Sequence, residues 1–218
     1  MIQQTTVPIT DRTRIFELMA VLITAVGKFV LMDWLNYRFF YVAAAIVFWS
    51  GYVIFKSKRL PGILSHWGFS KATFKQAFKV VIPFAVFAVI SFFTVGAIRG
   101  SLTLTWHILP ILISYPLWGV IQQFLVIGLV AGNLNDMKRV KVPKWIVIGI
   151  TALLFAVVHF PSTWLMASTF VLALFYGYVY LKVKNLYVLG LFHGVLGALF
   201  YYTVLGEDPF ARIFLSLF

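Results

Sequence analysis

Apolar residues fall into seven long runs, which short polar segments separate. Each run is too long for a strand of a membrane barrel and lacks strict alternation of apolar and polar positions, so the pattern predicts helices. A helix needs about 20 mostly apolar residues to cross the hydrocarbon core of a bilayer. The expected spans are 15–35, 39–55, 78–98, 107–131, 145–160, 164–181 and 186–205. The pattern therefore predicts an all-α, polytopic transmembrane helix bundle of about seven spans.

Composition supports a membrane protein and argues against nucleic-acid binding. The chain has 218 residues, of which 62% are hydrophobic and 11% are charged, whereas average soluble chains carry about 25% charged residues. The net charge of +12 could by itself suggest a nucleic-acid partner. Because the Lys and Arg residues cluster in short segments between apolar runs, we instead expect them to face anionic lipid. The predicted partner is the lipid bilayer, with no nucleic acid.

The basic residues also predict an orientation. Fourteen of the 18 Lys and Arg residues precede the first run or lie between the second and third, fourth and fifth, or sixth and seventh runs. Seven spans with an inside N-terminus would place all of these on the cytoplasmic side. We therefore expect an integral protein of the plasma or bacterial inner membrane with a cytoplasmic N-terminus. The first run is expected to be a permanent helix rather than a cleaved signal.

One internal boundary is plausible, in the long basic segment 56–79. Residues 1–60 are expected to form an N-terminal helical pair, and residues 61–218 a helical core. The core ends in a short apolar tail, 209–218, which is too short to span the membrane. We expect the tail to lie in the interface or to pack against the bundle.

The most informative stretch is WGVIQQFLVIGL, in which Gln122 and Gln123 stand side by side among apolar residues. An amide without a hydrogen-bond partner in an apolar phase costs about 2–7 kcal/mol. His159 and His193 lie in the fifth and seventh runs, and modest helix tilts would bring them to the level of the glutamines. The hypothesis is a shared polar pocket in which the histidines are the partners of the amides. The alternative is that each residue is satisfied separately, as a hydrogen bond between packed helices.

Catalytic chemistry has little support in these residues. The chain has no G-x-S-x-G or H-E-x-x-H motif, and its six acidic residues fall in termini, loops or helix ends. Activation of water requires a base or a metal, and a glutamine amide supplies neither. Two imidazoles with two amide oxygens make a poor zinc site, and there is no cysteine. We expect no metal and no cofactor.

Three motifs, in order along the chain, resemble those of the CPBP (CAAX protease and bacteriocin-processing, Abi) family of intramembrane proteases. WGVIQQFLVIG resembles the E-E-x-x-x-R motif of that family, LLFAVVHFP its F-x-x-x-H motif, and NLYVLGLFHGVLGALF its H-x-x-x-N motif. The resemblance covers about residues 67–205. It implies a polytopic fold and CAAX-protease-like endopeptidase activity. In the family, the first glutamate and the second-motif histidine are thought to activate water, while the last histidine and the asparagine polarise the scissile carbonyl.

This chain keeps only part of that set. Phe155, His159 and His193 match, and the resemblance implies that His159 would orient water and that His193 would donate to an oxyanion. The degenerate positions are Gln122 and Gln123 for the two glutamates, Ile127 for the arginine and Gly197 for the asparagine. With a neutral residue at position 123 no charge remains to pair, so the loss of the arginine is consistent with the loss of the glutamate.

Three functions remain open. The favoured one is a catalytically impaired relative, a pseudoenzyme that acts as a membrane scaffold or peptide-binding protein with a membrane protein or peptide as its partner. The alternative is a divergent intramembrane endopeptidase that uses His159 and His193 to activate water and stabilise an oxyanion. A transporter or lipid-binding role is the third.

Overall fold

The computed structural model describes residues 7–215, and within that range the chain is all-α, with no β-strand. Three of the helical segments contain a π-helical stretch (η1, η2 and η3), in which the turn is wider than in an α-helix. In chain order the elements are α1 (Asp11–Gly27), η1 (Lys28–Trp34), α2 (Arg38–Arg59), α3 (Ile63–Trp67), α4 (Phe74–Arg99), α5 (Ile108–Gln123), η2 (Phe124–Ala131), α6 (Gly132–Asp136), α7 (Lys144–Val157), α8 (Thr163–Val183), α9 (Leu186–Phe200), η3 (Tyr201–Leu205) and α10 (Pro209–Ile213).

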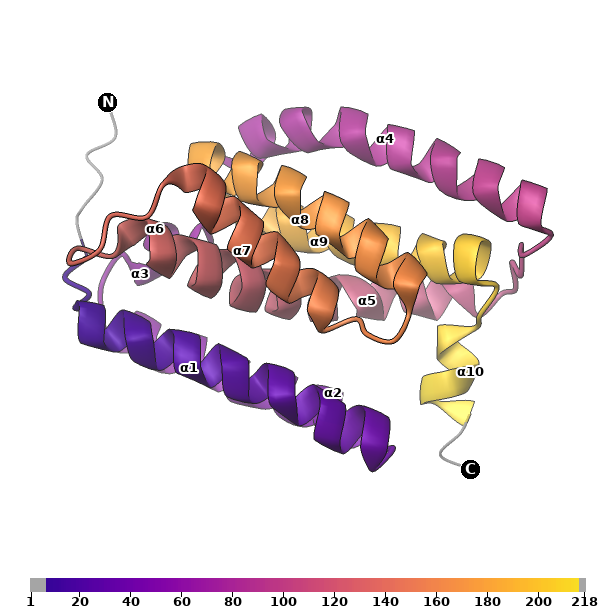
Figure 1. The fold of residues 1–218 in the computed structure, drawn as a ribbon, viewed down its shortest axis with the longest axis horizontal. Helices are drawn as coiled ribbons and strands as arrows, with labels where there is room; N and C mark the ends of the chain where they lie inside the picture. The colour runs from indigo at the N-terminus through magenta and orange to yellow at the C-terminus, as the bar shows by residue number, and fades with distance from the viewer. Residues whose placement is uncertain (1–6, 216–218) are drawn as a thin grey trace.

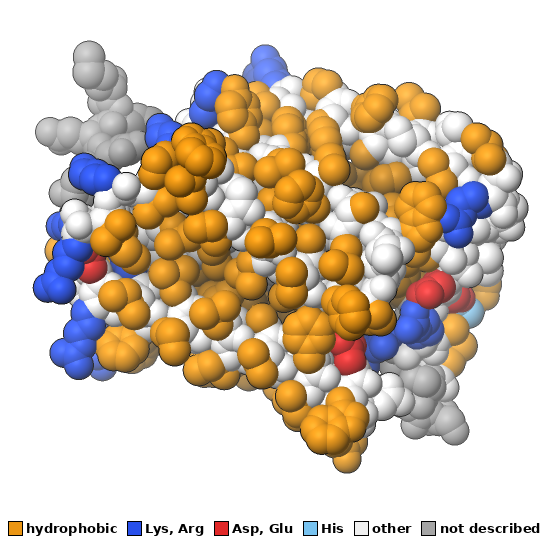
Figure 2. All heavy atoms as spheres, in the orientation of Figure 1, with side chains coloured by type: hydrophobic (Ala, Val, Ile, Leu, Met, Phe, Trp, Pro, Cys, Tyr) orange, Lys and Arg blue, Asp and Glu red, His pale blue; other side chains and the backbone are white. Residues whose placement is uncertain are grey.

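Six of the helical segments in residues 7–215 are long and apolar enough to cross a membrane. These segments are Asp11–Trp34, Arg38–Arg59, Phe74–Arg99, Ile108–Asp136, Thr163–Val183 and Leu186–Leu205. Their outer surfaces are predominantly apolar, as Figure 2 shows for one face. The protein is therefore an integral membrane protein, and the all-α bundle predicted from the sequence is confirmed.

The remaining expected span, 145–160, forms the shorter helix α7, which has 14 residues. At 1.5 Å per residue its length is about 21 Å, less than the roughly 30 Å of a hydrocarbon core. The helix stops at Val157, and the following turn includes His159. A membrane crossing by α7 stays a prediction.

Helices α5 and α9 lie at the centre of the bundle, with α4 along one side and α1 and α2 along the other (Figure 1). The two central helices touch through glycine. A Cβ atom added at Gly119 would lie 2.5 Å from the carbonyl oxygen of Gly190, and one added at Gly194 would lie 2.5 Å from Cα of Pro116. Small residues allow such close approach of membrane helices. The contact brings Gln122 and His193 into hydrogen-bonding range.

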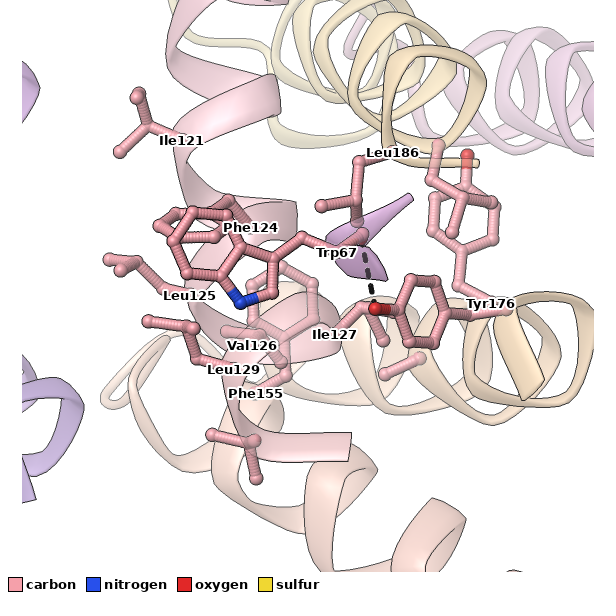
Figure 3. Close-up of a cluster of buried hydrophobic side chains, with 14 of the residues drawn as sticks. Trp67, Ile121, Phe124, Leu125, Val126, Ile127, Leu129, Phe155, Tyr176 and Leu186 are labelled. Carbon is pink, nitrogen blue, oxygen red and sulfur yellow. Dashed lines mark hydrogen bonds between the residues drawn. The ribbon is translucent and has the colours of Figure 1, made fainter. Parts of the chain in front are cut away.

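The short helix α3 is folded into the core rather than left at the surface. Its Trp67 is 2% exposed and packs edge-to-face on Phe124, with 5.0 Å between ring centroids (Figure 3). The hydroxyl of Tyr180 donates to the carbonyl oxygen of Trp67 at 2.9 Å. The segment between α2 and α4 is thereby attached to the start of η2, directly after the two glutamines.

Contacts between loops gather the basic segments at one end of the bundle. The carboxylate of Asp11 accepts hydrogen bonds from the backbone N–H groups of Lys138 and Arg139, at 3.0 and 2.9 Å for the closest pairs. Nε of Arg14 donates to the carbonyl oxygen of Asp136 at 3.1 Å. We call this end of the bundle, which carries Arg14, Lys138 and Arg139, the basic end. That it faces the cytoplasm stays a prediction.

The C-terminal tail packs against the other end of the bundle, one of the two placements expected from the sequence. Its short helix α10 follows Asp208, whose side chain caps it by accepting from the N–H groups of Phe210 and Ala211. The rings of Phe210 and Phe214 pack on a small cluster around Ile111. Residues 216–218 lie outside the described range.

Candidate functional site

The two neighbouring glutamines point to different surroundings. Gln122 lines a cavity, whereas Gln123 does not and is fully buried. Neither amide atom of Gln123 has a hydrogen-bond partner among residues 7–215. The helix changes from α to π at Phe124, directly after this pair. Such π-helical stretches are frequent at functional sites, and nothing in the sequence analysis predicted this one.

His193 is the partner of Gln122. Nε2 of His193 lies 2.9 Å from Oε1 of Gln122. An amide oxygen only accepts hydrogen bonds, so Nε2 carries the proton and Nδ1 carries the lone pair. Nδ1 is buried without a partner in the described part of the chain. The expectation that a histidine satisfies the first amide agrees with this geometry, while no histidine satisfies Gln123.

His159 lies on the turn after α7, and a backbone carbonyl group fixes the orientation of its ring. Its Nδ1 is 2.7 Å from the carbonyl oxygen of Phe155, which can only accept, so Nδ1 donates and Nε2 keeps the lone pair. The ring of Phe155 lies between the two histidines, with its centroid 5.0 Å from that of His159 and 5.3 Å from that of His193. The three residues that match the family pattern thus form one contiguous group, although no hydrogen bond joins His159 to Gln122.

A cavity of about 670 Å³ adjoins this group. That volume lies within the usual range for small-molecule sites, about 300–1,000 Å³. Its wall is mostly apolar and is built from α1, α2, α4, α5, α7, α8 and α9, with α10 at one end. The polar residues discussed above that line it are Gln122, His159 and His193. No Asp or Glu of the described chain lines the cavity.

The other two degenerate positions differ in how they are filled. Gly197 lines the cavity, and a Cβ atom added there would meet nothing within 4 Å. Ile127 is fully buried and belongs to the apolar cluster of Figure 3. Thus the asparagine position is open space beside the histidines, and the arginine position is part of the hydrophobic core.

Glu17 is a buried acidic residue whose burial the sequence analysis did not predict. It is 4% exposed and accepts hydrogen bonds from the hydroxyl of Tyr52 and, at 2.7 Å, from Nδ2 of Asn133. Asn133 lies about 16 Å beyond Gln122 along the same helical segment, so Glu17 is not part of the cavity. A carboxylate less than one turn inside the first apolar run was the available signal.

Lys28 does lie beside the cavity. Its Nζ is 2.5 Å from Oδ2 of Asp33 and 3.1 Å from the carbonyl oxygen of Phe160. Phe160 follows His159 directly, so Lys28 connects the end of the first span to the turn that carries the histidine.

Comparison with protein families identifies the core of the chain. The model of the Rce1-like type II CAAX prenyl endopeptidases matches residues 69–199, more than half of the chain. The protein belongs to this family. The matched region contains all seven motif positions discussed above, and the resemblance inferred from the motifs is confirmed. Comparisons with curated proteins and with solved structures gave no significant match.

The family match locates the family's core within the chain and does not test which of these residues act. The region starts at residue 69, inside the core that we expect from residue 61 onward. The division into a helical pair, 1–60, and a core, 61–218, stays a prediction, as do the roles of Gln122, Gln123, His159 and His193.

Proposed function

We propose that this Rce1-like membrane protein is a catalytically impaired member of its family that binds an apolar peptide or a segment of a membrane protein. The observation that carries the proposal is the composition of the cavity wall. Gln122 stands at the position of the first glutamate of the family motif and is hydrogen-bonded to His193. No carboxylate of residues 7–215 lines the cavity.

The hydrogen bond affects two catalytic steps at once. A general base needs a lone pair that is basic near neutral pH, and an amide oxygen has none. The Nε2–H of His193, the group that would donate to an oxyanion, is already directed at Gln122. Gly197 offers no side-chain donor. Water activation and carbonyl polarisation are therefore both weakened.

Binding, by contrast, remains well supported. The cavity wall is mostly apolar with a few polar groups, the usual character of a ligand site. It reaches the outer surface at Phe87, Leu117 and Val171, which are 69, 58 and 55% exposed. An apolar segment can enter there directly from the hydrocarbon.

In the same proposal the basic end faces the cytoplasm, α7 completes a seventh crossing and the first 60 residues pack outside the family core.

A peptide-cleavage assay tests the impairment. The full chain, purified in detergent, is incubated with prenylated and with hydrophobic peptides, alongside the double variant His159→Ala/His193→Ala. We expect the two proteins to show the same background. Cleavage by the wild type that the double variant loses would overturn the proposal, provided that His66→Ala, a histidine outside the cavity, retains it.

One observation favours the alternative, a divergent endopeptidase. His159 lines the cavity with its Nδ1 held by Phe155, so the lone pair of its Nε2 is available to a water molecule. In that mechanism His159 would be the base. Loss of cleavage in the single variant His159→Ala, with Gln122→Ala unaffected, would support it.

Restoration of the motif gives an independent test of the site. Gln122→Glu with Gly197→Asn returns a carboxylate and a donor to two positions that line the cavity, and Gly197 has space for the side chain. Gln123 and Ile127 are left unchanged because both are buried away from the cavity, and a new charge there would need its own partner. We expect cleavage to appear, and to disappear again when His193→Ala is added.

A further inference from the structure

Within residues 7–215, the charged side chains that line the cavity are all cationic. They are Lys28, Arg38 and Arg212, from η1, the first turn of α2 and α10. These elements meet at the end of the bundle opposite to the basic end. An apolar cavity with positive charge at one end complements a molecule that has an apolar chain and an anionic headgroup.

Arg38 differs from the other two cations in its partners. Lys28 pairs with Asp33, and Arg212 pairs with Glu207. Arg38 makes no ion pair and no hydrogen bond within residues 7–215. Two tyrosines, Tyr115 and Tyr201, line the same cavity, and both lie within the electrostatic reach of Arg38 and of Arg212.

Those two tyrosines pack edge-to-face, with 6.3 Å between ring centroids. Neither hydroxyl has a hydrogen-bond partner in the described chain. A guanidinium and two phenolic O–H groups are together a strong donor set for an oxyanion, and a guanidinium binds phosphate or carboxylate through two parallel bonds.

We propose that the cavity binds an anionic lipid, with its headgroup at Arg38, Tyr115 and Tyr201 and its acyl chain along the apolar wall. The open side at Phe87, Leu117 and Val171 lets a lipid enter from the bilayer. Each buried CH₂ group of the chain adds about 0.8 kcal/mol, a gain that a small soluble anion lacks. Because Lys28 and Arg212 are each paired with a carboxylate, the unbalanced charge at this end of the cavity is that of Arg38. A guanidinium attracts the phosphate of a lipid and repels the ammonium of a zwitterionic headgroup, so the site favours net negative charge.

This inference is independent of the proposed function, because lipid binding requires neither peptide nor hydrolysis. Its test uses the full chain in detergent, mixed with lysophosphatidylglycerol or lysophosphatidylcholine, two single-chain lipids that differ in net charge. Native mass spectrometry measures the lipid retained. We expect the wild type to retain lysophosphatidylglycerol in preference to lysophosphatidylcholine. Arg38→Gln should weaken the retention of lysophosphatidylglycerol about tenfold, the scale of one charge-assisted hydrogen bond.

The matched control is Arg99→Gln. Arg99 ends α4 on the same side of the bundle and lies over the ring of Trp164 at 4.6 Å, but it does not line the cavity. We expect its retention of lipid to equal that of the wild type. An equal loss in both arginine variants, or equal retention of the two lipids by the wild type, would show general attraction to the surface and overturn the proposal.

A second variant tests the apolar part of the site separately. Gly197→Leu adds an apolar side chain into open space in the cavity and leaves the headgroup donors Arg38, Tyr115 and Tyr201 unchanged. If the acyl chain occupies the cavity, this variant retains less of both lipids while it folds normally. Unchanged retention would place the lipid outside the cavity. None of these outcomes depends on whether peptides are cleaved.

Discussion

Across the contact between α5 and α9, Nε2 of His193 donates to Oε1 of Gln122 over 2.9 Å. Both groups lie on helices whose backbones touch through glycine, so the distance is set by packing rather than by flexible side chains. In an active member of the family a carboxylate would occupy the place of this amide. In the proposed function, this bond occupies the Nε2–H of His193 that would otherwise donate to an oxyanion.

Replacement of one partner should cost more than replacement of both. Gln122→Leu leaves the Nε2–H of His193 without an acceptor, and we expect a loss of about 1–3 kcal/mol in the free energy of unfolding. The double variant Gln122→Leu/His193→Phe removes the unpaired donor and should recover most of that loss. Thermal unfolding in detergent compares the wild type, the two single variants and the double variant, which together form a double-mutant cycle. Additive losses would mean that the two side chains do not interact.

The glycines between α5 and α9 should not tolerate a methyl group. Gly194→Ala places Cβ 2.5 Å from Cα of Pro116, a backbone atom that cannot move aside. We expect a loss of about 1–3 kcal/mol, typical of overpacking, in thermal unfolding. Gly149→Ala on α7 is the matched control, because its Cβ meets nothing within 4 Å. That variant should be neutral or slightly more stable, since alanine favours a helix.

The buried carboxylate of Glu17 should be sensitive to removal of its charge. In Glu17→Gln the amide nitrogen would bring donors toward Tyr52 or Asn133, both of which already donate to this site. We expect a loss of about 1–3 kcal/mol from the mismatched hydrogen bonds. Addition of Tyr52→Phe should then cost little more. A wild-type melting temperature for Glu17→Gln would show that the network does not stabilise α1 against α2 and α6.

Acid should release the contact between Asp208 and the bundle. Partial burial raises the pKa of Asp208, but hydrogen bonds from His107 and Tyr202 outweigh it and hold the pKa below its ordinary value. A carboxyl of this kind stabilises the fold above its unfolded pKa of about 4, and the contribution is lost as pH falls through the lower folded value.

The difference in melting temperature between wild type and Asp208→Asn should therefore be constant near neutral pH and shrink below about pH 4. Glu207→Gln is the control, because the pair of Glu207 with Arg212 is solvent-exposed and contributes little. A difference that does not change with pH would contradict the assigned role of the Asp208 carboxylate.

Much of the fold follows from local rules. The apolar runs around Phe74–Arg99 and Thr163–Val183 determine helices by themselves, because in hydrocarbon each backbone group must be paired within its own segment. The identity of the site residues also follows from sequence, because polar side chains in such runs are costly and therefore few. Gln122, His159 and His193 could be selected on that basis, and the family is recognisable from their spacing.

The sequence could not decide how those residues are paired. Gln122 and Gln123 are adjacent and chemically identical, yet one faces the cavity and the other is buried without a partner among residues 7–215. Neighbouring residues of a helix point about 100° apart, and the packing of the surrounding helices decides which of the two directions leads to the cavity. Likewise the absence of a carboxylate from the cavity wall, and the meeting of Arg38 with Tyr115 and Tyr201, depend on which helices touch. Composition and spacing are properties of one helix at a time, whereas a site is a property of the distances between helices, and only tertiary packing determines these.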